Sequence, residues 1–224
     1  MTSIRDLLTG FGYKSYMLCC ALAFTIPTIG GVAGPAEESR ILHMRLGMHE
    51  EARGCADAPI TIIEFTDYQY PYCRRFQSEA WPRLKRKYVD SGKVRFIVRD
   101  LPLEFHSAAR PAAEVAHCAG EQGTFWPRHE ALLRNSTELN DSYVVPLERE
   151  LGLDLPQLRA CVLGGRYEGA IARNAVEAES LGIHGTPTFI VGRTAEGKLD
   201  GIRVAGALHY EKFAAYLDRM LPKP

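Results

Sequence analysis

Cysteine is the residue type in this chain best suited to chemistry. Among the six cysteines, Cys73 is the most favourably placed, at the end of the segment Tyr70-Pro71-Tyr72-Cys73. This segment follows an apolar strand, and Pro71 favours the first turn of a helix because its missing N–H is not needed there. Free N–H groups and the helix dipole stabilise a thiolate at such a place, so the chemistry indicated is that of a reactive thiol. The N-cap position itself, however, is Tyr70 and carries no sulfur.

The other cysteines are less well placed for that chemistry. Cys55 precedes the strand and Cys73 follows it, so a strand of about 20 Å separates them. A disulfide requires Cα atoms within about 7 Å, and we therefore expect no bond between these two. Cys118 and Cys161 share one helical region and are expected to form a disulfide, two unpaired buried thiols being the alternative.

Other titratable side chains define no second reaction. Glu64 falls within the apolar strand and is expected to be buried; an edge position that reaches solvent is the alternative. A cysteine–histidine hydrolase using His184 is a poor interpretation, because nothing supplies an oriented third group or an oxyanion hole. The histidines show no metal-ligand spacing with the cysteines, so we expect no metal site and no cofactor.

The elements that position these residues follow from the hydrophobic pattern. Residues 59–65 are β-branched and apolar, which is typical of a buried strand, and residues 94–98 repeat the pattern. A helix is expected between them over residues 71–88, with a bend at Pro82. Strand, helix and strand at this spacing form a βαβ unit, which implies a parallel pair.

The rest of the chain divides into a helical block and a second β region. Residues 103–182 contain no convincing strand, and their helical runs centre on residues 107–119, 124–134, 142–151, 156–163 and 167–181. Strands are expected at residues 188–191 and 201–206, and a closing amphipathic helix at residues 210–221.

The N-terminal segment is expected to lie outside the fold. Residues 15–36 carry no charge, basic residues precede them, and Pro27 interrupts the apolar run before small residues follow. This pattern is typical of a secretory signal. An uncleaved membrane anchor is the alternative, because the uncharged stretch is just long enough to span a bilayer. We expect residues 1–33 to be this signal or anchor, and residues 34–58 to be a mobile lead-in.

Composition excludes some classes of protein. The chain has 27 basic and 27 acidic side chains, which argues against a nucleic-acid binder that works through a large excess of positive charge. Hydrophobic residues make up 46% and charged residues 24%, so an ordinary globular protein of one or two domains is indicated.

Two segments carry a resemblance to a known family: residues 64–76 (EFTDYQYPYCRRF) and residues 182–189 (GIHGTPTF). Over roughly residues 55–221 the sequence resembles the DsbA-like branch of the thioredoxin superfamily. The resemblance implies an α/β thioredoxin-like fold, βαβ plus ββα, with an inserted all-helical domain. The thioredoxin domain would comprise residues 59–102 and 183–224, and the insertion residues 103–182.

The resemblance also implies a site. In this family the helix opens with Cys-Pro-x-Cys, and a Thr-Pro pair with a cis peptide bond lies opposite. The corresponding site residues are Glu64, Cys73, His184, Thr186 and Pro187. His184 is expected to face the thiol, and Glu64 to influence it. The first cysteine of the pair is replaced by Tyr70, and dithiol exchange needs both sulfurs.

Two functions therefore remain open. The first is an exported, periplasmic or extracytoplasmic thiol:disulfide oxidoreductase that acts on extended or unfolded protein substrates, with Cys73 as a reactive single thiol. The second is a redox-inactive peptide-binding or chaperone-like module that uses the groove at Pro187. The glutathione-dependent isomerase and transferase branch fits less well, because Cys73 and residues 74–76 follow the DsbA-like pattern. The resemblance leaves room for a membrane redox partner; no nucleic-acid partner is expected, and the oligomeric state stays open.

Overall fold

The computed structural model describes residues 41–47, 50–136, 139 and 152–222. The predicted signal or anchor at residues 1–33 lies outside these ranges, as does the predicted helix at residues 142–151. Among the helices of the described residues, none combines the length and hydropathy that a membrane span requires.

Six strands form one sheet in the order β1-β6-β5-β3-β4-β2. Their bounds are β1 Ile41–Arg45, β2 Glu51–Arg53, β3 Ile60–Thr66, β4 Val94–Asp100, β5 Thr188–Ala195 and β6 Lys198–Ala205. β3 pairs parallel with β4 and antiparallel with β5, and β5 pairs antiparallel with β6. These are the predicted βαβ and ββα halves, joined side by side through β3 and β5. The hairpin between β5 and β6 turns at Glu196 and Gly197, both with positive φ, as a two-residue hairpin loop requires.

The two outermost strands correct one prediction. Residues 34–58 are not a mobile lead-in throughout, because they contain both edge strands, β1 and β2. β1 pairs antiparallel with β6, and β2 with β4. Leu42 and Met44 of β1 are buried while their neighbours are exposed, an alternation that the sequence already contains. Such short edge strands depend on a partner strand for their hydrogen bonds, and the local sequence does not show that partner.

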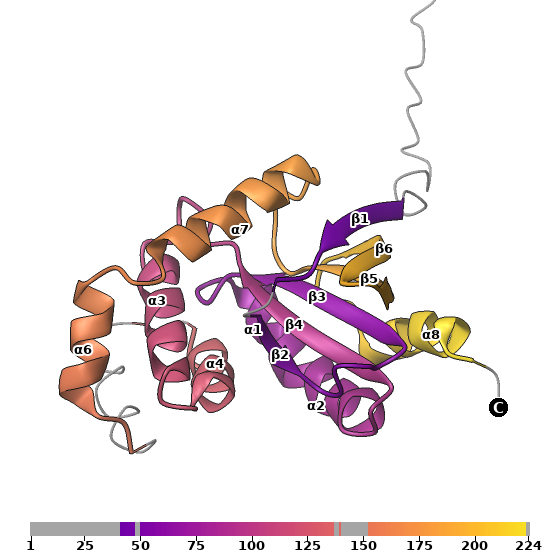
Figure 1. Cartoon of the computed structure of the whole chain (residues 1–224), viewed down its shortest axis with the longest axis horizontal. Helices are drawn as coiled ribbons and strands as arrows, with labels where there is room; N and C mark the ends of the chain where they lie inside the picture. Colours follow the sequence, from indigo (N-terminus) through magenta and orange to yellow (C-terminus); the bar gives the residue numbers. More distant parts are fainter. Residues whose placement is uncertain (1–40, 48–49, 137–138, 140–151, 223–224) are drawn as a thin grey trace, which may run out of the picture. The chain divides into compact units, whose positions relative to one another are not determined.

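The helical run after β3 extends from Pro71 to Val89 without a break (Figure 1). It consists of α1 (Pro71–Arg75), a π-helical turn η1 (Phe76–Ala80), α2 (Trp81–Leu84) and a second π-helical turn η2 (Lys85–Val89). A proline inside an α-helix clashes with the carbonyl four residues earlier. Here the N–H of Trp81, just before Pro82, bonds the carbonyl five residues earlier. The helix therefore passes Pro82 by widening into a π-helical turn.

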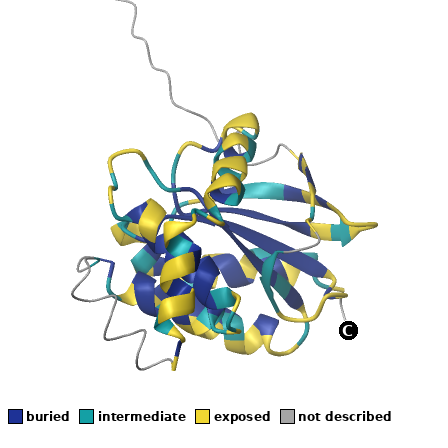
Figure 2. Cartoon of the chain, turned by 60° about the vertical axis from the view of Figure 1, so that its left-hand side comes forward, coloured by how far each residue is buried: buried dark blue, intermediate teal, exposed yellow. Residues whose placement is uncertain are grey.

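The remaining helices are α3 (Ala109–Gly120), α4 (Phe125–Arg134), α6 (Leu155–Leu163), α7 (Glu168–Ser180) and α8 (Tyr210–Met220). α3, α4 and α8 contribute buried side chains to the same core as the helical run that begins with α1, on one face of the sheet. α7 contributes to a second core on the other face. Figure 1 shows α7 and α2 on opposite sides of the sheet, and Figure 2 shows the buried strands between exposed helix surfaces.

A third, smaller cluster surrounds a disulfide. Cys118 on α3 and Cys161 on α6 are bonded, with their Cα atoms 5.9 Å apart, as predicted from their shared helical region. Both cysteines are buried, and Leu153 and Leu158 pack around them. The bond therefore ties α6 to α3, whose other side chains belong to the main core. The predicted insertion is thus joined to the thioredoxin sheet by a shared core as well as by the chain.

Candidate functional site

The site lies where β3 ends and α1 begins. Tyr70 is the N-cap residue of α1, with extended backbone, and its side chain makes no capping hydrogen bond. The N–H of Cys73 donates to the Tyr70 carbonyl at 3.1 Å, which places Cys73 one turn into the helix. The ring of Tyr70 packs 5.3 Å from that of Tyr72 and 5.5 Å from that of His106, measured between centroids. A half-buried aromatic side chain thus occupies the position where an attacking sulfur would stand.

Cys73, three residues after Tyr70, is fully buried. The backbone N–H of Asp67 donates to its Sγ at 3.5 Å. Burial, together with the smaller effect of the nearby Glu64 carboxylate, raises the pKa of the Cys73 thiol to about 12, against opposing effects from hydrogen bonds of the Thr186 hydroxyl and the Asp67 N–H. A sulfur with this pKa is a neutral thiol at physiological pH, and the thiolate is the reactive form.

Glu64 lies inside β3 and is also fully buried, so the buried interpretation is correct. Neither carboxylate oxygen has a hydrogen-bond partner among the described residues. Burial raises the pKa of Glu64 to about 8, a value that includes a smaller lowering by the nearby Thr66 hydroxyl. At neutral pH the group is therefore mostly a neutral acid, because a buried carboxylate without partners is costly.

The peptide bond between Thr186 and Pro187 is cis, as expected. The Pro187 carbonyl accepts a hydrogen bond from the Gly206 N–H at 2.8 Å, and the Thr188 hydroxyl donates to the Gly185 carbonyl at 2.6 Å. The backbone N–H and C=O of Thr186 have no hydrogen-bond partner within the described ranges. Thr186, two residues before β5 begins, thus has free backbone groups and is held in place from both sides.

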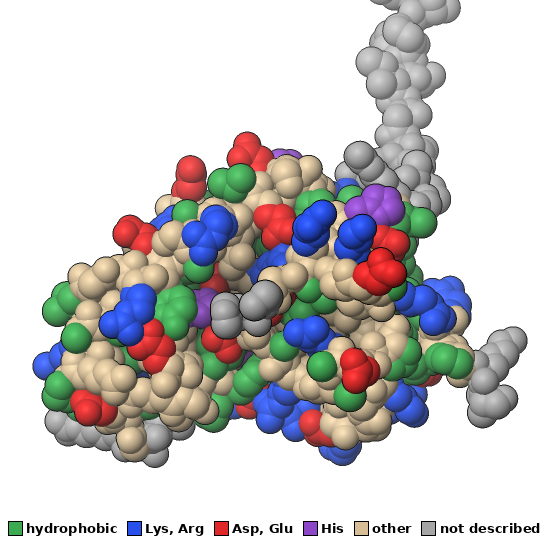
Figure 3. All heavy atoms as spheres, in the orientation of Figure 1, with side chains coloured by type: hydrophobic (Ala, Val, Ile, Leu, Met, Phe, Trp, Pro, Cys, Tyr) green, Lys and Arg blue, Asp and Glu red, His purple; other side chains and the backbone are tan. Residues whose placement is uncertain are grey.

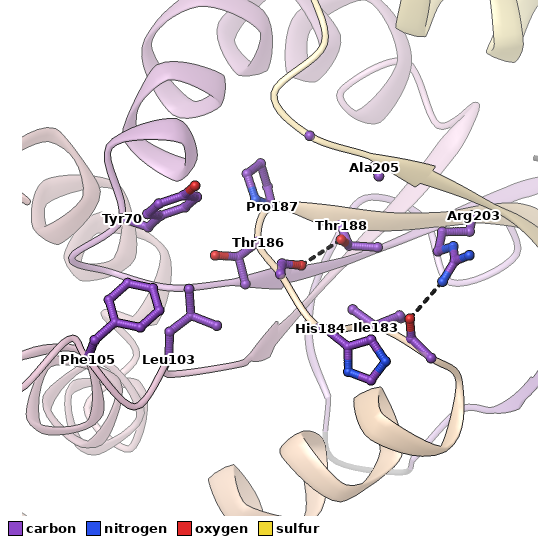
Figure 4. A pocket seen from close by; sticks show the side chains of 13 residues that line it. Tyr70, Leu103, Phe105, Ile183, His184, Thr186, Pro187, Thr188, Arg203 and Ala205 are labelled. Atoms are coloured by element: carbon purple, nitrogen blue, oxygen red, sulfur yellow. Dashed lines mark hydrogen bonds between the residues drawn. The ribbon is translucent and has the colours of Figure 1, made fainter. Parts of the chain in front are cut away.

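A hollow of about 590 Å³ separates the side chain of Tyr70 from the segment that contains Thr186 and Pro187. Figure 4 shows the rings of Tyr70 and Phe105 on one side of it and Thr186 and Pro187 opposite. Residues 182–188 and β6 complete the lining. We name this hollow the cis-proline groove. Its walls combine exposed aromatic rings with free backbone groups, a combination that suits an extended polypeptide.

His184 does not behave as predicted. Its side chain is exposed on the lining of the cis-proline groove, beside Ile183 in Figure 4. Within the described part of the chain its ring makes no hydrogen bond or ion pair, and none of the groups that shift the Cys73 pKa is His184. The expectation that it faces the thiol is not supported. In the loop that follows α7, Ile183 is buried while the next side chain, His184, is exposed, which the sequence alone does not show.

Sequence reasoning missed the residues that fix the groove wall. Asp67 is buried and accepts hydrogen bonds from three groups: the Gln69 N–H at 2.7 Å, the Leu103 N–H at 2.8 Å and His106 Nδ1 at 2.9 Å. It therefore ties the loop that carries Phe105 to the turn after β3. Its place in the turn segment 66–69 is an available signal, because Asp commonly bonds backbone N–H groups in turns.

No second cysteine of the described residues is close to Cys73. Cys55 is free and exposed, and it lies near Gly92, before the beginning of β4, while Cys73 lies beyond the end of β3. The seven-residue strand β3 separates these two positions, as predicted. Cys118 and Cys161 bond each other. Among the described residues, no three His, Cys, Asp or Glu side chains gather into a group that could hold a metal ion.

A mixed sheet of βαβ and ββα halves, with a cis proline opposite the beginning of a helix, defines a protein of the thioredoxin class. The sequence model of the thioredoxin family matches residues 48–219, and the chain belongs to this family. Within it the chain is a DsbA-like member of the thiol–disulfide oxidoreductases. Its structure matches alpha-DsbA1 of Wolbachia pipientis with a TM-score of 0.72 and 21% identity, over 79% of this chain and 93% of that one.

Two further similarities support this assignment. A thioredoxin-like oxidoreductase from Silicibacter pomeroyi DSS-3 is 30% identical, with a TM-score of 0.61, over 76% of this chain and 91% of that one. Disulfide bond formation protein D of Bacillus subtilis is 27% identical over 147 residues, which are 62% of this chain and 65% of that protein.

A third similarity covers only a part of a larger protein. The Na(+)/H(+) antiporter NhaA 3 of Salinispora tropica is 37% identical over 150 residues, which are 66% of this chain and 22% of the antiporter. The chain therefore spans about a fifth to a quarter of the length of the first curated relatives that it matches.

Proposed function

We propose that this chain is an exported DsbA-like protein that binds extended polypeptide segments in the cis-proline groove and does not carry out dithiol exchange. The observation that carries the proposal is the pair of residues at the start of α1: Tyr70 at the N-cap and a fully buried Cys73 behind it. Dithiol exchange requires one sulfur to attack and a second to resolve the mixed disulfide. Only the second position holds a sulfur here.

The alternative, in which Cys73 reacts as a single thiol, is disfavoured by its surroundings. A substrate disulfide would have to reach a side chain with no exposed surface. The raised pKa of Cys73, about 12, leaves roughly one thiol in 10⁵ ionised at pH 7. Glu64, close to it, opposes ionisation at higher pH, since its own carboxylate is then charged.

The groove supports polypeptide binding through two kinds of contact. The free backbone groups of Thr186 can pair with the backbone of an extended segment, in the manner of an added strand. Tyr70 and Phe105 offer aromatic surface beside them, and Phe105 is 74% exposed. Exposed aromatic rings held next to unpaired backbone groups are typical of binding surfaces.

Export is part of the proposal. The Cys118–Cys161 disulfide supports it, because such bonds persist in oxidising compartments. The segment at residues 1–33, with its uncharged stretch ending in small residues, would provide the signal, or an anchor if it is not cleaved.

We predict that Cys73 resists alkylation while Cys55 reacts. Both are free, but Cys55 is exposed and Cys73 is buried, so one protein provides the test and its reference. Treatment of the native protein with iodoacetamide at neutral pH, followed by peptide mapping, should show complete modification of Cys55 and almost none of Cys73. Denaturant should make both react. Equal rates in the native protein would support the single-thiol function instead.

We also predict that Phe105→Ala weakens peptide binding roughly tenfold, as loss of an aromatic anchor commonly does. Binding of a fluorescein-labelled peptide with a central Phe, measured by anisotropy, provides the test. Leu163→Ala is the matched control, because Leu163 is 88% exposed on α6, outside the groove lining. Absence of binding by the unaltered protein, or an equal loss in both variants, would contradict the proposed function.

A further inference from the structure

A second hollow, of about 560 Å³, adjoins the cis-proline groove. Its lining consists of Pro71, Tyr72, Arg74, Arg75, Ser78, Glu79 and Arg134, and we name it the arginine hollow. Consecutive residues line the two hollows, since Tyr70 lines the first and Pro71 the second. Arg75 also reaches toward the groove, because its guanidinium donates to the carbonyl of Ala207, the residue after the groove-lining Gly206, at 3.0 Å. An extended polypeptide that leaves the cis-proline groove past Tyr70 would therefore meet the arginine hollow.

The arginine hollow carries positive charge that its own lining does not neutralise. Glu79 is its one carboxylate against three arginines. Arg75 bonds a neutral carbonyl and lies 4.8 Å from the centroid of the Tyr72 ring, and no acid of the described residues forms an ion pair with it. Arg134 comes no closer than 4.0 Å to Glu130, whose Oε1 already accepts from Arg53.

Arg74 completes this excess of charge. It is partly exposed, and among the described residues it has no hydrogen bond or ion pair. Several arginines elsewhere in the described chain stand beside acids: Arg83 beside Glu211, Arg99 beside Glu50 and Glu177, and Arg166 beside Glu121. The face drawn in Figure 3 likewise shows basic and acidic side chains interspersed. Because the whole chain has no net charge, the cluster is a local feature and not a consequence of composition.

We propose that the arginine hollow binds a carboxylate side chain of the polypeptide held in the cis-proline groove, so that the preferred segments place Asp or Glu beside an aromatic or apolar residue. This inference rests on the proposed function. Guanidinium groups bind carboxylates through paired hydrogen bonds in fixed geometry, which favours such segments over those with neutral or basic neighbours. The hollow is open to solvent, and salt at physiological strength therefore weakens the preference.

The test compares three labelled peptides on the full chain. Each has a central Phe, flanked on both sides by Glu, by Gln or by Lys. At low ionic strength the Glu peptide should bind roughly tenfold more tightly than its Gln counterpart, and the Lys peptide more weakly than both. The gap between the Glu and Gln peptides should narrow as NaCl is added. Equal affinities of these two peptides would overturn the inference while leaving the proposed function intact, whereas binding of none would contradict the proposed function itself.

Two double variants assign the preference to the arginine hollow. Arg74→Gln with Arg134→Gln should reduce the affinity for the Glu peptide to that for the Gln peptide. Arg86→Gln with Arg159→Gln removes the same charge from exposed positions outside both hollows and should leave the tenfold preference in place. Retention of the preference by the first pair, or its loss in the second, would show that net charge or another surface is responsible and would overturn the inference. Circular dichroism and the Cys73 alkylation pattern check that each variant is folded.

Discussion

The Tyr70→Cys variant is expected to catalyse thiol–disulfide exchange, and the unaltered protein is expected not to. Residue 70 is the N-cap of α1, and the Cys73 N–H bonds its carbonyl, so sulfurs at the two positions would be separated by a single helical turn. A thiol at the N-cap stands beside the helix N–H groups and, unlike Cys73, at the surface, which lowers its pKa and lets it attack. Cys73 can then resolve the mixed disulfide, releasing the reduced substrate and leaving an internal disulfide.

The measurement is reduction of a protein disulfide such as that of insulin, with glutathione or dithiothreitol as the electron source. Tyr70→Ser is the matched control, because it removes the same ring without adding a sulfur. Tyr70→Cys combined with Cys73→Ser retains the attacking thiol but lacks the resolving one, and should accumulate mixed disulfides without turnover. Activity in the unaltered protein would contradict our interpretation of Tyr70. A folded Tyr70→Cys variant without activity would show that the site differs from a working enzyme in more than this residue.

The second large effect is a loss of stability as pH rises, and the Glu64→Gln variant is expected to abolish this loss. The pKa of Glu64 is about 8 in the fold against 4.5 for the exposed group. Below pH 4.5 the carboxyl is neutral in the folded and unfolded states alike, and its ionisation does not change the free energy of unfolding. Between pH 4.5 and 8 the unfolded chain releases the proton and the folded chain retains it, so the free energy of unfolding falls as pH rises. The total loss is about 4 to 5 kcal/mol, at about 1.4 kcal/mol per pKa unit.

Urea unfolding at several pH values tests this expectation. Glu64→Gln should match the unaltered protein near pH 4 and exceed it progressively up to about pH 8, above which the difference becomes constant. The amide has nearly the same shape but does not ionise, so the difference between the two curves isolates the titration of this one group. Glu179→Gln, at an exposed position on α7, is the control and should leave the pH dependence unchanged. A pH-independent difference for Glu64→Gln would mean that the carboxylate finds a partner or water in the fold.

Several parts of this protein are predictable because their signals are local. The apolar run of β3 and Pro71 after it predict a strand followed by a helix, and Glu64 within that run predicts a buried acid. The predicted helical runs that correspond to α3, α4, α6 and α7 are a further example. Each of these helices begins and ends within a residue or two of the predicted bounds. In these segments, periodicity and propensity agree with the final fold.

Other parts depend on pairing between distant segments. The edge strands β1 and β2 are too short to be recognised without β6 and β4 beside them. Asp67 becomes a site residue only because Leu103 and His106 are brought to it across the sheet end. His184 is adjacent in sequence to the cis-proline segment, yet its side chain is exposed, because the direction of a loop side chain is set by the surrounding packing.

The sequence by itself determined the βαβ and ββα halves around a helical block and the tyrosine at residue 70, because these follow from residue types and their spacing, and its resemblance to a known family implied the thioredoxin-like fold. Only the tertiary structure decided how the remaining sulfur behaves. The reactivity of Cys73 depends on exposure and on nearby charge, and packing buries it beneath Tyr70 close to Glu64. The gathering of Arg74, Arg75 and Arg134 has the same origin. The first two are neighbours in sequence, but only the fold brings α4 against the beginning of α1 and places the third arginine beside them.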